Sequence, residues 1–473
     1  MNHIFELPDH WDEATDIAVI GSGFAGLSAA IKAAEAGARV IIIEKMSHYG
    51  GNSLISGGGC CSYDSRLHLR QKLGLGDDSW QLHMDDTIKG GDNKSIPELV
   101  EIMVKHAPDA IDLFLKVGVE FADTLPRLGG HSAHRSYLTI GNKGIIMTEP
   151  LLKSAIDAGA ILRLNTGVTR IWRAGPDSPV EGIEIKTVDS IKELRVRQAI
   201  IIASGGFSQD VEFRKKYNPN LTEAYNCSNH KGATGECIRF AQSIGADVIH
   251  MKYIQLFPTA NPNTGGLDKQ ALDAYSSTGF GSVCVDKNGR RFVNELGRRD
   301  EVSDAQILGL KDKPTYTILN KKIFDALAVS DIDIQAGIKS GRITSAETVS
   351  ELAEKLNMAE LTDTINKHNR YLETGIDPEF NKEISKFMVP MTQGPFYAIS
   401  QWPTIHFCMG GLRFDKEAHV IDTSGNIIPR LYAAGECCGG IHGANRLAGN
   451  AITECIVFGT IAGFNASKET AND

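Results

Sequence analysis

The stretch DIAVIGSGFAGLSAAIKAAEAGARVIIIEK, residues 16–45, decides the fold of this chain. Residues 16–20 predict a strand, residues 27–36 predict a helix, and the β-branched run 39–44 predicts a second strand. Gly21-Ser22-Gly23-Phe24-Ala25-Gly26 joins the first strand to the helix. A glycine-rich turn in this context is typical of a Rossmann-type unit that binds a dinucleotide.

The residues of this turn have separate physical roles. Gly21 permits the tight turn, Gly23 lets the backbone approach a pyrophosphate, and Gly26 lets the helix pack closely on the strand. The N-terminus of the helix supplies amide donors and a partial positive charge for the phosphates. Glu44 ends the second strand, where its carboxylate can accept hydrogen bonds from ribose hydroxyls and disfavours a 2′-phosphate.

Length and composition indicate a soluble enzyme. A chain of 473 residues with 42% hydrophobic content can bury a large core. Its net charge of −9, with no basic block, argues against nucleic-acid binding. Its nine cysteines lack disulfide or zinc spacing, so we expect reduced thiols and no metal site. Residues 1–16 contain no lysine or arginine, and no run of ~18 apolar residues occurs, so we expect a cytoplasmic protein without a membrane segment, unless a leader was removed.

Two features outside the glycine-rich turn favour FAD over NAD. The loop KMSHYGGNSLISGGG, residues 45–59, follows the ribose-binding strand directly and can offer amides and hydroxyls to an extended cofactor. Far downstream, residues 431–436 predict a strand that ends in Ala-Gly-Glu, and a helix begins near Asn450. A helix N-terminus beside an isoalloxazine ring can stabilise the negative charge of the reduced flavin.

The pattern of predicted secondary structure changes twice along the chain. Strand and glycine-rich patterns give way to polar helical stretches near Tyr253 and return after Ile405. We therefore expect an α/β fold with a discontinuous Rossmann-type FAD-binding domain, residues 1–253 and 405–473, and an inserted α+β capping domain for the substrate, residues 254–404. The helices predicted from periodicity include residues 95–117, 149–158, 332–339, 346–356 and 361–372.

Six further stretches carry a family resemblance. They are GGNSLISGG at 50–58, DDTIKGGD at 85–92, ASGGF at 203–207, GRRFVNELGRRD at 289–300, HFCMGG at 406–411 and LYAAGECCGGIHGANRLAGNAI at 431–452. Together with the glycine-rich start they span nearly the whole chain. By these motifs the chain resembles the fumarate reductase and succinate dehydrogenase flavoprotein family, especially its soluble flavocytochrome c-type branch of fumarate and urocanate reductases. The resemblance implies an active site between a flavin domain and a capping domain.

The resemblance also implies a reaction, the reduction of the C=C bond of an α,β-unsaturated carboxylate. Hydride would come from flavin N5, and the proton from an arginine that corresponds to Arg299. A guanidinium is so weak an acid that this needs a strongly basic carbanion and a site without water. Arg446, in the HGANR stretch, would clamp the substrate carboxylate with its planar fork, and His406 would bind the same carboxylate.

Three positions depart from the family pattern. The family usually has Gln-x-His-Pro-Thr where this chain has QLFPT, so Phe257 replaces a histidine that would hold the second carboxylate of fumarate. Counted back from Arg299, the family's proton-relay glutamate and arginine correspond to Tyr275 and Thr278. We expect Phe257 and Tyr275 to contact substrate, and Tyr275 is a second candidate for the acid. The expected substrate has one carboxylate and a flat or apolar far end, as in urocanate or a cinnamate-type acrylate.

The motifs and the resemblance together imply a non-covalently bound FAD, because no residue recognised for flavin attachment is present. The expected FAD-binding residues are Gly21, Gly23, Ala25, Gly26, Glu44, Lys45, Gly51, Asn52, Ser53, Gly57, Gly58, Val168, Ala203, Ser204, Gly205, Gly435, Glu436, Arg446, Asn450, Ala451 and Ile452. No Cys-x-x-Cys-His haem motif and no iron–sulfur cysteine run occurs. Electrons must therefore come from an external donor, which could be a redox protein, reduced flavin or NADH.

Two other functions remain open from sequence. One is a flavin-dependent dehydrogenase or oxidase on the same scaffold, similar to ketosteroid dehydrogenases, which need not keep both Arg299 and Arg446. The other is a non-catalytic flavin-binding relay subunit, which needs no carboxylate clamp. The presence of Arg299, His406 and Arg446 favours the reductase.

Overall fold

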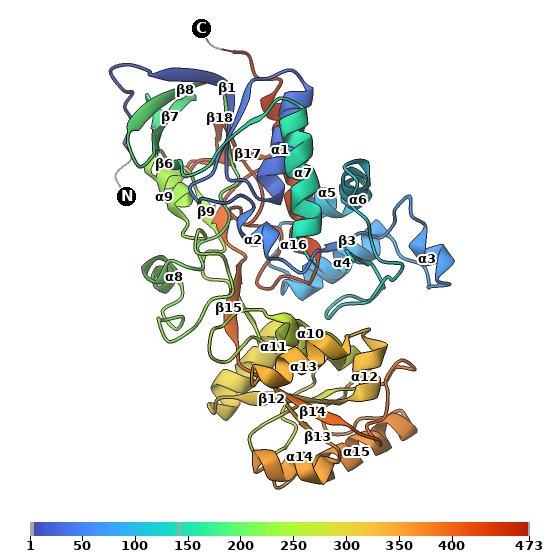
Figure 1. Cartoon of the computed structure of the whole chain (residues 1–473). Coiled ribbons are helices and arrows are strands. Elements are labelled where there is room, and N and C mark those ends of the chain that lie inside the picture. Colours follow the sequence, from blue (N-terminus) through green and yellow to red (C-terminus); the bar gives the residue numbers. More distant parts are fainter. Residues whose placement is uncertain (1–3, 141–142, 472–473) are drawn as a thin grey trace. The chain divides into compact units, whose positions relative to one another are not determined.

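The computed structural model describes residues 4–140 and 143–471, and the chain forms two compact units. Unit 1 comprises Met1–Thr222, Asn229–Ile254 and Phe407–Asp473, and unit 2 comprises Glu223–Ser228 and Gln255–His406. Figure 1 labels the elements of both units. Each unit has its own hydrophobic core, so each is described by itself.

Unit 1 is built around a mainly parallel sheet. Its strand order is β17-β18-β8-β1-β2-β5, and β6 and β7 extend it through β8. The strands β1, β2, β5, β8 and β18 pair in parallel, while β17 and the β6–β7 hairpin pair antiparallel. The bounds of these strands are β1 Glu13–Ile20, β2 Val40–Ile43, β5 Ile161–Arg163, β6 Gly167–Arg173, β7 Val180–Lys186, β8 Ile191–Ile202, β17 His419–Ile421 and β18 Ile427–Ala433.

Helices bury the central strands of this sheet. In β2 all four residues are buried, and Ile17 and Val19 of β1 have no exposed surface. Such continuous apolar strands are typical of parallel sheets that are covered on both faces. Helix α1 (Phe24–Glu35) packs against both α7 (Ile145–Asp157) and α16 (Asn450–Ala466), as Figure 1 shows. The sequence prediction of a Rossmann-type parallel core is confirmed.

The remaining elements of unit 1 are short. They are α2 Gly51–Leu54, β3 Gly59–Cys61, α3 Leu69–Lys72, α4 Trp80–Gly90, α5 Pro97–Lys105, α6 Ala107–Lys116, β4 Ser136–Leu138, α8 Val211–Tyr217, α9 Glu236–Ser243, β9 Val248–Ile249 and β16 Gly411–Leu412. The single helix predicted over residues 95–117 is wrong, because α5 and α6 are separate and meet at His106. Pro108 causes the break, since it lacks an N–H and its ring excludes a carbonyl one turn earlier.

Unit 2 is an α+β unit with a four-stranded antiparallel sheet. The order is β11-β12-β14-β13, with bounds β11 Val283–Val285, β12 Thr315–Asn320, β13 Ile343–Ala346 and β14 Phe396–Gln401. Its helices are α10 Lys269–Ser277, α11 Arg299–Asp304, α12 Lys321–Ala326, α13 Asp331–Lys339, α14 Val349–Leu356 and α15 Leu361–Thr374, with a 3₁₀ turn at Thr278–Phe280 and a π-helical turn at Ala305–Leu310. Helix α14 begins three residues later than predicted, because β13 takes residues up to Ala346 into the sheet.

Strands β10 (Ile254–Phe257) and β15 (Thr404–Cys408) pair with each other, and the chain passes from one unit to the other within each of them. The short segment Glu223–Ser228 also belongs to unit 2, where Cys227 forms a bridge with Ile405. No periodicity marks this segment in the sequence.

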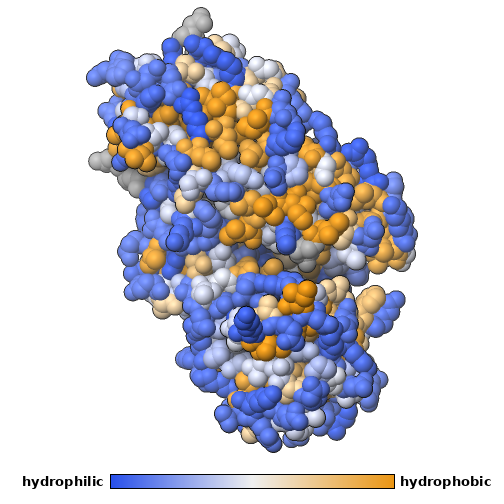
Figure 2. Space-filling view, viewed as in Figure 1, coloured by the Kyte–Doolittle hydropathy of each residue, from blue (hydrophilic) through white to orange (hydrophobic). Residues whose placement is uncertain are grey.

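The surface mixes polar and apolar residues. Ile145 and Ile156 of α7 are 41% and 44% exposed, and Figure 2 shows hydrophobic areas broken by hydrophilic ones on the face in view. Within residues 4–140 and 143–471, no helix has both the length and the apolar character needed to cross a membrane. All nine cysteines are free thiols.

Candidate active site

The predicted glycine turn joins β1 to α1 in unit 1. Gly21 has a φ of +109°, and a Cβ there would lie 2.3 Å from the carbonyl oxygen of Ala203. A Cβ on Gly26 would lie 2.0 Å from the carbonyl oxygen of Gly21. Neither contact is tolerable for a side chain, so helix, strand and turn can approach this closely only with glycine. The turn thus has the form that brings a helix N-terminus to a pyrophosphate.

Glu44 lies at the carboxyl end of β2 beside this turn. Its Oε2 accepts a hydrogen bond from the Ser22 hydroxyl at 2.5 Å, and its Oε1 accepts one from the Met46 amide at 3.0 Å. These bonds hold the carboxylate beside the glycine turn, and its role as a ribose acceptor stays a prediction. The ammonium group of Lys45 donates to Thr234 and pairs with Glu236.

The loop after β2 also contacts the turn. Ser53 in α2 accepts a hydrogen bond from the amide of Phe24 at 2.9 Å, so the loop touches the first residue of α1. Asn52 accepts from the amide of His230 at 2.7 Å and donates to Glu436 at 3.2 Å. Gly51 and Gly58 both have positive φ values, as expected for a loop that bends sharply.

The motif Ala-Gly-Glu at the end of β18 meets the same region. A Cβ on Gly435 would lie 3.0 Å from that of Ala25 in α1. Glu436 is buried and accepts hydrogen bonds from the amide of Cys408 at 3.0 Å and from Asn52. Burial raises the pKa of Glu436 to about 7, and these two hydrogen bonds oppose that rise. This carboxyl therefore titrates near neutral pH.

The N-terminus of α16 is held by a buried polar network. Asn450 donates to Thr87 at 3.0 Å, so its Oδ1 is the acceptor for Nε2 of His83 at 2.9 Å. Burial holds the pKa of His83 well below its ordinary value, so this imidazole is neutral and carries its proton on Nε2. Nearby, His131 donates to the carbonyl of Ala448 at 2.8 Å and accepts from Arg135. These contacts fix the loop that leads into α16.

Other residues expected to bind FAD lie along the same edge. The Ala203 amide donates to the Ile20 carbonyl at 2.8 Å, Gly205 has a φ of +73°, and Val168 lies in β6 opposite Ile185. The glycines, Glu44 and the start of α16 fit a dinucleotide cofactor, because they offer the close backbone approach and the ribose acceptor that FAD needs. Ala451 and Ile452 lie in the first turn of α16, and Ser204 and Gly57 are chain neighbours of Gly205 and Gly58.

Arg446 lies in the HGANR loop of unit 1 and is 5% exposed. Its guanidinium carbon is 4.6 Å from the centre of the Phe407 ring, and its Nη1 donates to the carbonyl of Leu447 at 3.2 Å. The same ring makes a T-shaped contact with His442, whose Nε2 lies 2.7 Å from Oε2 of the buried Glu454. The sequence analysis did not single out this His442–Glu454 pair, although His442 belongs to the quoted motif.

The HGANR loop is held against the Gly-Gly pair of the DDTIKGGD stretch. Asn445 donates to the carbonyl of Gly90 at 3.1 Å, and the amide of Ala444 donates to that of Gly91 at 2.9 Å. A Cβ on Gly91 would lie 2.5 Å from the carbonyl oxygen of His442. The motif therefore has a positioning role for the loop that carries Arg446.

The other predicted site residues form a cluster in unit 2. The guanidinium carbon of Arg299 lies 4.6 Å from the centre of the Phe257 ring and 4.7 Å from that of Tyr275. Phe257 is 2% exposed, and its ring centre is 5.0 Å from Tyr275 and 5.1 Å from His406. Nδ1 of His406 lies 2.9 Å from the hydroxyl of Ser228, which orients the imidazole.

Polar residues next to Arg299 and Tyr275 make contacts of their own within unit 2. Arg298 pairs with Asp300 at 2.5 Å. Thr278 donates its hydroxyl to the carbonyl of Tyr275 at 2.9 Å, so it closes the end of α10. Gln255 is the polar neighbour of Arg299, with its Oε1 3.5 Å from Nη1. Ser228 and Gln255 were missed in the sequence, since each acts through a contact distant along the chain.

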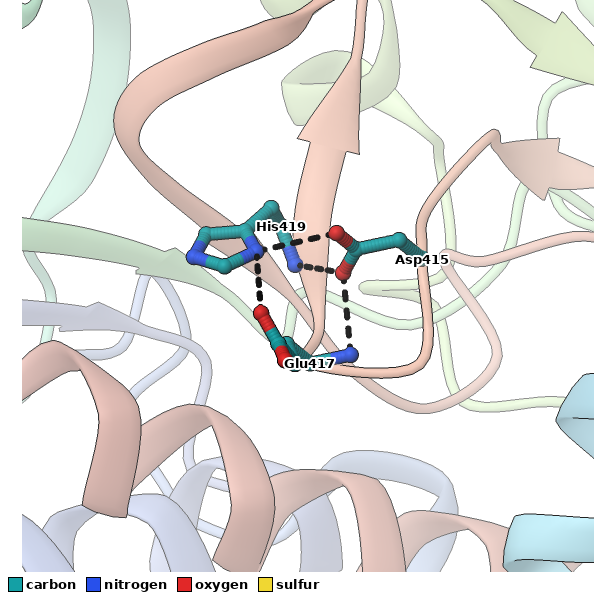
Figure 3. A group of neighbouring side chains, drawn as sticks. All are labelled: Asp415, Glu417 and His419. Carbon is teal, nitrogen blue, oxygen red and sulfur yellow. Dashed lines mark hydrogen bonds and ion pairs between the residues drawn. The ribbon is translucent and has the colours of Figure 1, made fainter.

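A separate polar group closes the turn before β17. Figure 3 shows Asp415, Glu417 and His419, with Nδ1 of His419 3.0 Å from Asp415 and 3.8 Å from Glu417. Asp415 also accepts from the backbone amides of Glu417 and His419 at 2.9 Å. The hydrogen bond to Asp415 raises the pKa of His419. These interactions satisfy one another and stabilise the turn.

A cavity of about 720 Å³ in unit 1 is lined by α1, α6 and α16 and by Arg66. Ile456, Val457 and Ile461 contribute its apolar wall, and Lys32 is among its charged residues. None of the residues expected to bind FAD or substrate lines this cavity, so it is not part of the candidate site.

Known proteins resemble this chain over almost its whole length. The family model described as FAD binding domain matches residues 16–452. Fumarate reductase (cytochrome) of Shewanella frigidimarina is 34% identical over 96% of this chain and 77% of the relative. Urocanate reductase of Eggerthella lenta is 33% identical over 98% and 76%, and the acrylate reductase flavoprotein subunit of Shewanella woodyi is 34% identical over 96% and 91%.

Solved structures agree with these matches. A flavocytochrome c3 fumarate reductase in its open conformation has a TM-score of 0.78 and 31% identity, covering 97% of this chain and 79% of that one. A 3-ketosteroid-Δ4-(5α)-dehydrogenase of Rhodococcus jostii has a TM-score of 0.75 at 22% identity, covering 98% of both chains, and shows the fold alone. The cofactor is FAD, and the protein is a flavin oxidoreductase acting on carbon–carbon double bonds. The chain belongs to the fumarate reductase and succinate dehydrogenase flavoprotein family.

Proposed function

We propose that this protein reduces the C=C bond of an α,β-unsaturated acid that has one carboxylate and an apolar or aromatic far end. The observation that carries the proposal is the cluster of unit 2, in which Arg299 lies against the rings of Phe257 and Tyr275. Relatives named fumarate, urocanate and acrylate reductases support the reaction type. Together these observations favour an alkenoate reductase whose substrate is not a dicarboxylate.

In this proposal Arg446 and His406 hold the substrate carboxylate. The guanidinium fork of Arg446 matches two carboxylate oxygens, and Phe407 beneath it fixes the plane of the fork. Ser228 fixes the ring of His406 through Nδ1. A carboxylate in this clamp is oriented, and its adjacent double bond is thereby placed for reaction.

Arg299 is proposed to give the proton. FAD, when bound and reduced by the external donor, would supply the hydride to one alkene carbon. The electron pair of the double bond then forms the new C–H bond at the other carbon with a proton from Arg299, which regains its proton from solvent. Positioning and electrostatic stabilisation of the carbanion-like state by the cationic side chain both contribute to such a step.

The far end of the substrate is where this chain differs from a fumarate site. Phe257 has no hydrogen-bond donor on its side chain, and it is buried in the cluster. Placing a second carboxylate against it would leave that charge desolvated, at a cost of several kcal/mol. Tyr275, which is partly exposed, offers a ring face that a flat group could contact. An aryl acrylate or urocanate fits these constraints.

Electrons are proposed to come from outside this chain, from a redox protein, reduced flavin or NADH. The assay can bypass that donor. Purified protein is reduced by a viologen dye without oxygen and given a panel of unsaturated acids and enones, and dye oxidation is followed. Oxidation by one or more alkenoates supports the proposal. Oxidation by none of them, or oxidation only by enones that carry no carboxylate, contradicts it.

A further inference from the structure

Arg299 is held by aromatic rings instead of by a carboxylate. The acids next to it on α11 are engaged elsewhere, because Asp300 pairs with Arg298 and Glu301 accepts the Arg298 amide at 2.9 Å. Among the described residues, none forms an ion pair with Arg299, and its Nε is buried without a hydrogen-bond partner. The contacts that fix the guanidinium are therefore those with Phe257 and Tyr275, together with a long hydrogen bond of 3.5 Å from its Nη1 to Oε1 of Gln255.

The two rings form a rigid support, which we call the aromatic shelf. Phe257 lies in β10 and is wedged between Tyr275 and His406. Tyr275 is carried by α10, whose N-terminus is capped by the side chain of Asp268. Asp268 in turn pairs with Arg342, so the helix that presents Tyr275 is anchored to the rest of unit 2. A shelf fixed at both ends can orient a flexible guanidinium.

Arg291, eight residues earlier in the same motif, shows the alternative arrangement, in which carboxylates hold the guanidinium. It pairs with Glu295 and Asp377, both at 2.8 Å, and its guanidinium carbon lies 4.9 Å from the Phe380 ring. Burial opposes its positive charge, yet hydrogen bonds to Glu295 and Asp377 raise the pKa of Arg291. Carboxylates of this kind hold the proton on a guanidinium and use up its donors. Aromatic faces attract the cation more weakly and accept no conventional hydrogen bond, so the N–H groups stay directed at other partners.

We infer that Phe257 and Tyr275 are positioning residues that hold Arg299 for proton delivery, and that Tyr275 does so through its ring and not through its hydroxyl. This inference rests on the proposed function, in which Arg299 is the proton donor. It assigns Phe257 a role besides excluding a second carboxylate. It also predicts that losing either ring slows the proton step even for a substrate too small to reach the rings.

The test uses the FAD-loaded enzyme and acrylate, which has no aromatic group to stack. The variants are Phe257→Leu, Tyr275→Leu and Tyr275→Phe, with Phe257→Tyr as a ring-preserving partner. The control is Phe380→Leu, which removes the ring beside Arg291 in the same unit. Measured quantities are kcat, KM, the solvent deuterium isotope effect on kcat, and the rate at which viologen reduces the flavin.

We expect each leucine variant to lose on the order of 10–100-fold in kcat, the range that misplacement of a reacting group produces. KM and flavin reduction should change little, and the isotope effect should rise because proton transfer becomes slower. The loss in kcat should be at least tenfold smaller in Tyr275→Phe and Phe257→Tyr than in the leucine variants. Phe380→Leu should keep the wild-type kcat.

Three results would overturn the inference. Equal losses in Tyr275→Phe and Tyr275→Leu would make the hydroxyl the active group. Wild-type kcat for acrylate in Phe257→Leu, with a raised KM for aryl acrylates only, would leave Phe257 as a substrate-stacking residue. A loss in Phe380→Leu as large as in Phe257→Leu would indicate a general effect on unit 2. If the wild-type enzyme reduces no alkenoate, the proposed function itself fails, and that outcome is separate from these.

Discussion

The guanidinium carbon of Arg299 lies 4.6 Å from the centre of the ring of Phe257, the residue that replaces a histidine of the family pattern. This contact joins the proposed acid, which this chain shares with the family, to Phe257, which replaces a hydrogen-bonding residue of the family pattern. It places a cation against an apolar ring, an arrangement that attracts the cation without neutralising its charge. The predictions on activity and substrate follow from it.

Arg299→Ala should abolish alkene reduction and leave FAD bound and reducible by dye. General acid catalysis contributes roughly 10²–10⁴-fold, and loss of carbanion stabilisation adds to this. Arg298→Ala is the matched control, since Arg298 pairs with Asp300 instead. It should stay close to wild type in viologen-coupled turnover. Near-normal turnover of Arg299→Ala would move the acid role to another group, with Tyr275 the first to examine.

Fumarate should be a poor substrate compared with urocanate and cinnamate-type acids. The unpaired second carboxylate of fumarate should lower affinity at least ~10²-fold, which corresponds to a few kcal/mol. Phe257→His would restore a donor and should raise kcat/KM for fumarate relative to cinnamate. Steady-state kcat/KM values for the three acids provide the comparison. Fumarate as the clearly best substrate of the wild-type enzyme would rule out the one-carboxylate account.

The flavin should be released by acid precipitation as FAD. No residue recognised for covalent attachment was found in the sequence, while the turn at Gly21 and Gly26 and the carboxylate of Glu44 fit a dinucleotide held without a covalent bond. Chromatography of the supernatant identifies the flavin. Yellow colour that remains in the protein pellet, or FMN in the supernatant, would contradict this prediction.

Glu436 should make stability depend on pH. Its pKa is about 7 when folded, against an ordinary value of 4.5, because burial disfavours the charged form. The folded state therefore holds this proton more tightly, so the stabilisation is complete below pH 4.5 and is lost as the pH rises through 7. Over that window wild type should lose about 1.4 kcal/mol per pH unit relative to Glu436→Gln. Chemical unfolding of both proteins measures this difference, and a constant difference across the window would disprove the linkage.

Local signals explain why much of the fold was predictable. The alternation of buried strand, glycine turn and helix over residues 16–45 is a short-range pattern, and β1, α1 and β2 form as it predicts. Pro108 is also a local signal, but the amphipathic spacing over residues 95–117 outweighed it and gave one helix instead of two. Ala346 was predicted to be the first residue of a helix, and pairing of β13 with β14 placed it in a strand instead.

Motif positions in the sequence proposed residues for the candidate site, but they could not give the contacts between them. Motif positions identified Arg299, His406, Phe257 and Tyr275, and the structure brings these four together in unit 2. The stacking of Arg299 on two rings depends on β10, α10 and α11 meeting in space, which no local pattern shows. The same is true of Ser228, which reaches His406 across 178 positions of the chain.

The most direct test of the account is a single turnover with the flavin as its own reporter. Enzyme carrying reduced FAD is mixed without oxygen with one equivalent of cinnamate, and flavin absorbance and the saturated acid are measured together. The account predicts flavin reoxidation with one saturated acid formed per flavin, and no reoxidation on this timescale in Arg299→Ala. Flavin that stays reduced with cinnamate, urocanate and acrylate alike would contradict it.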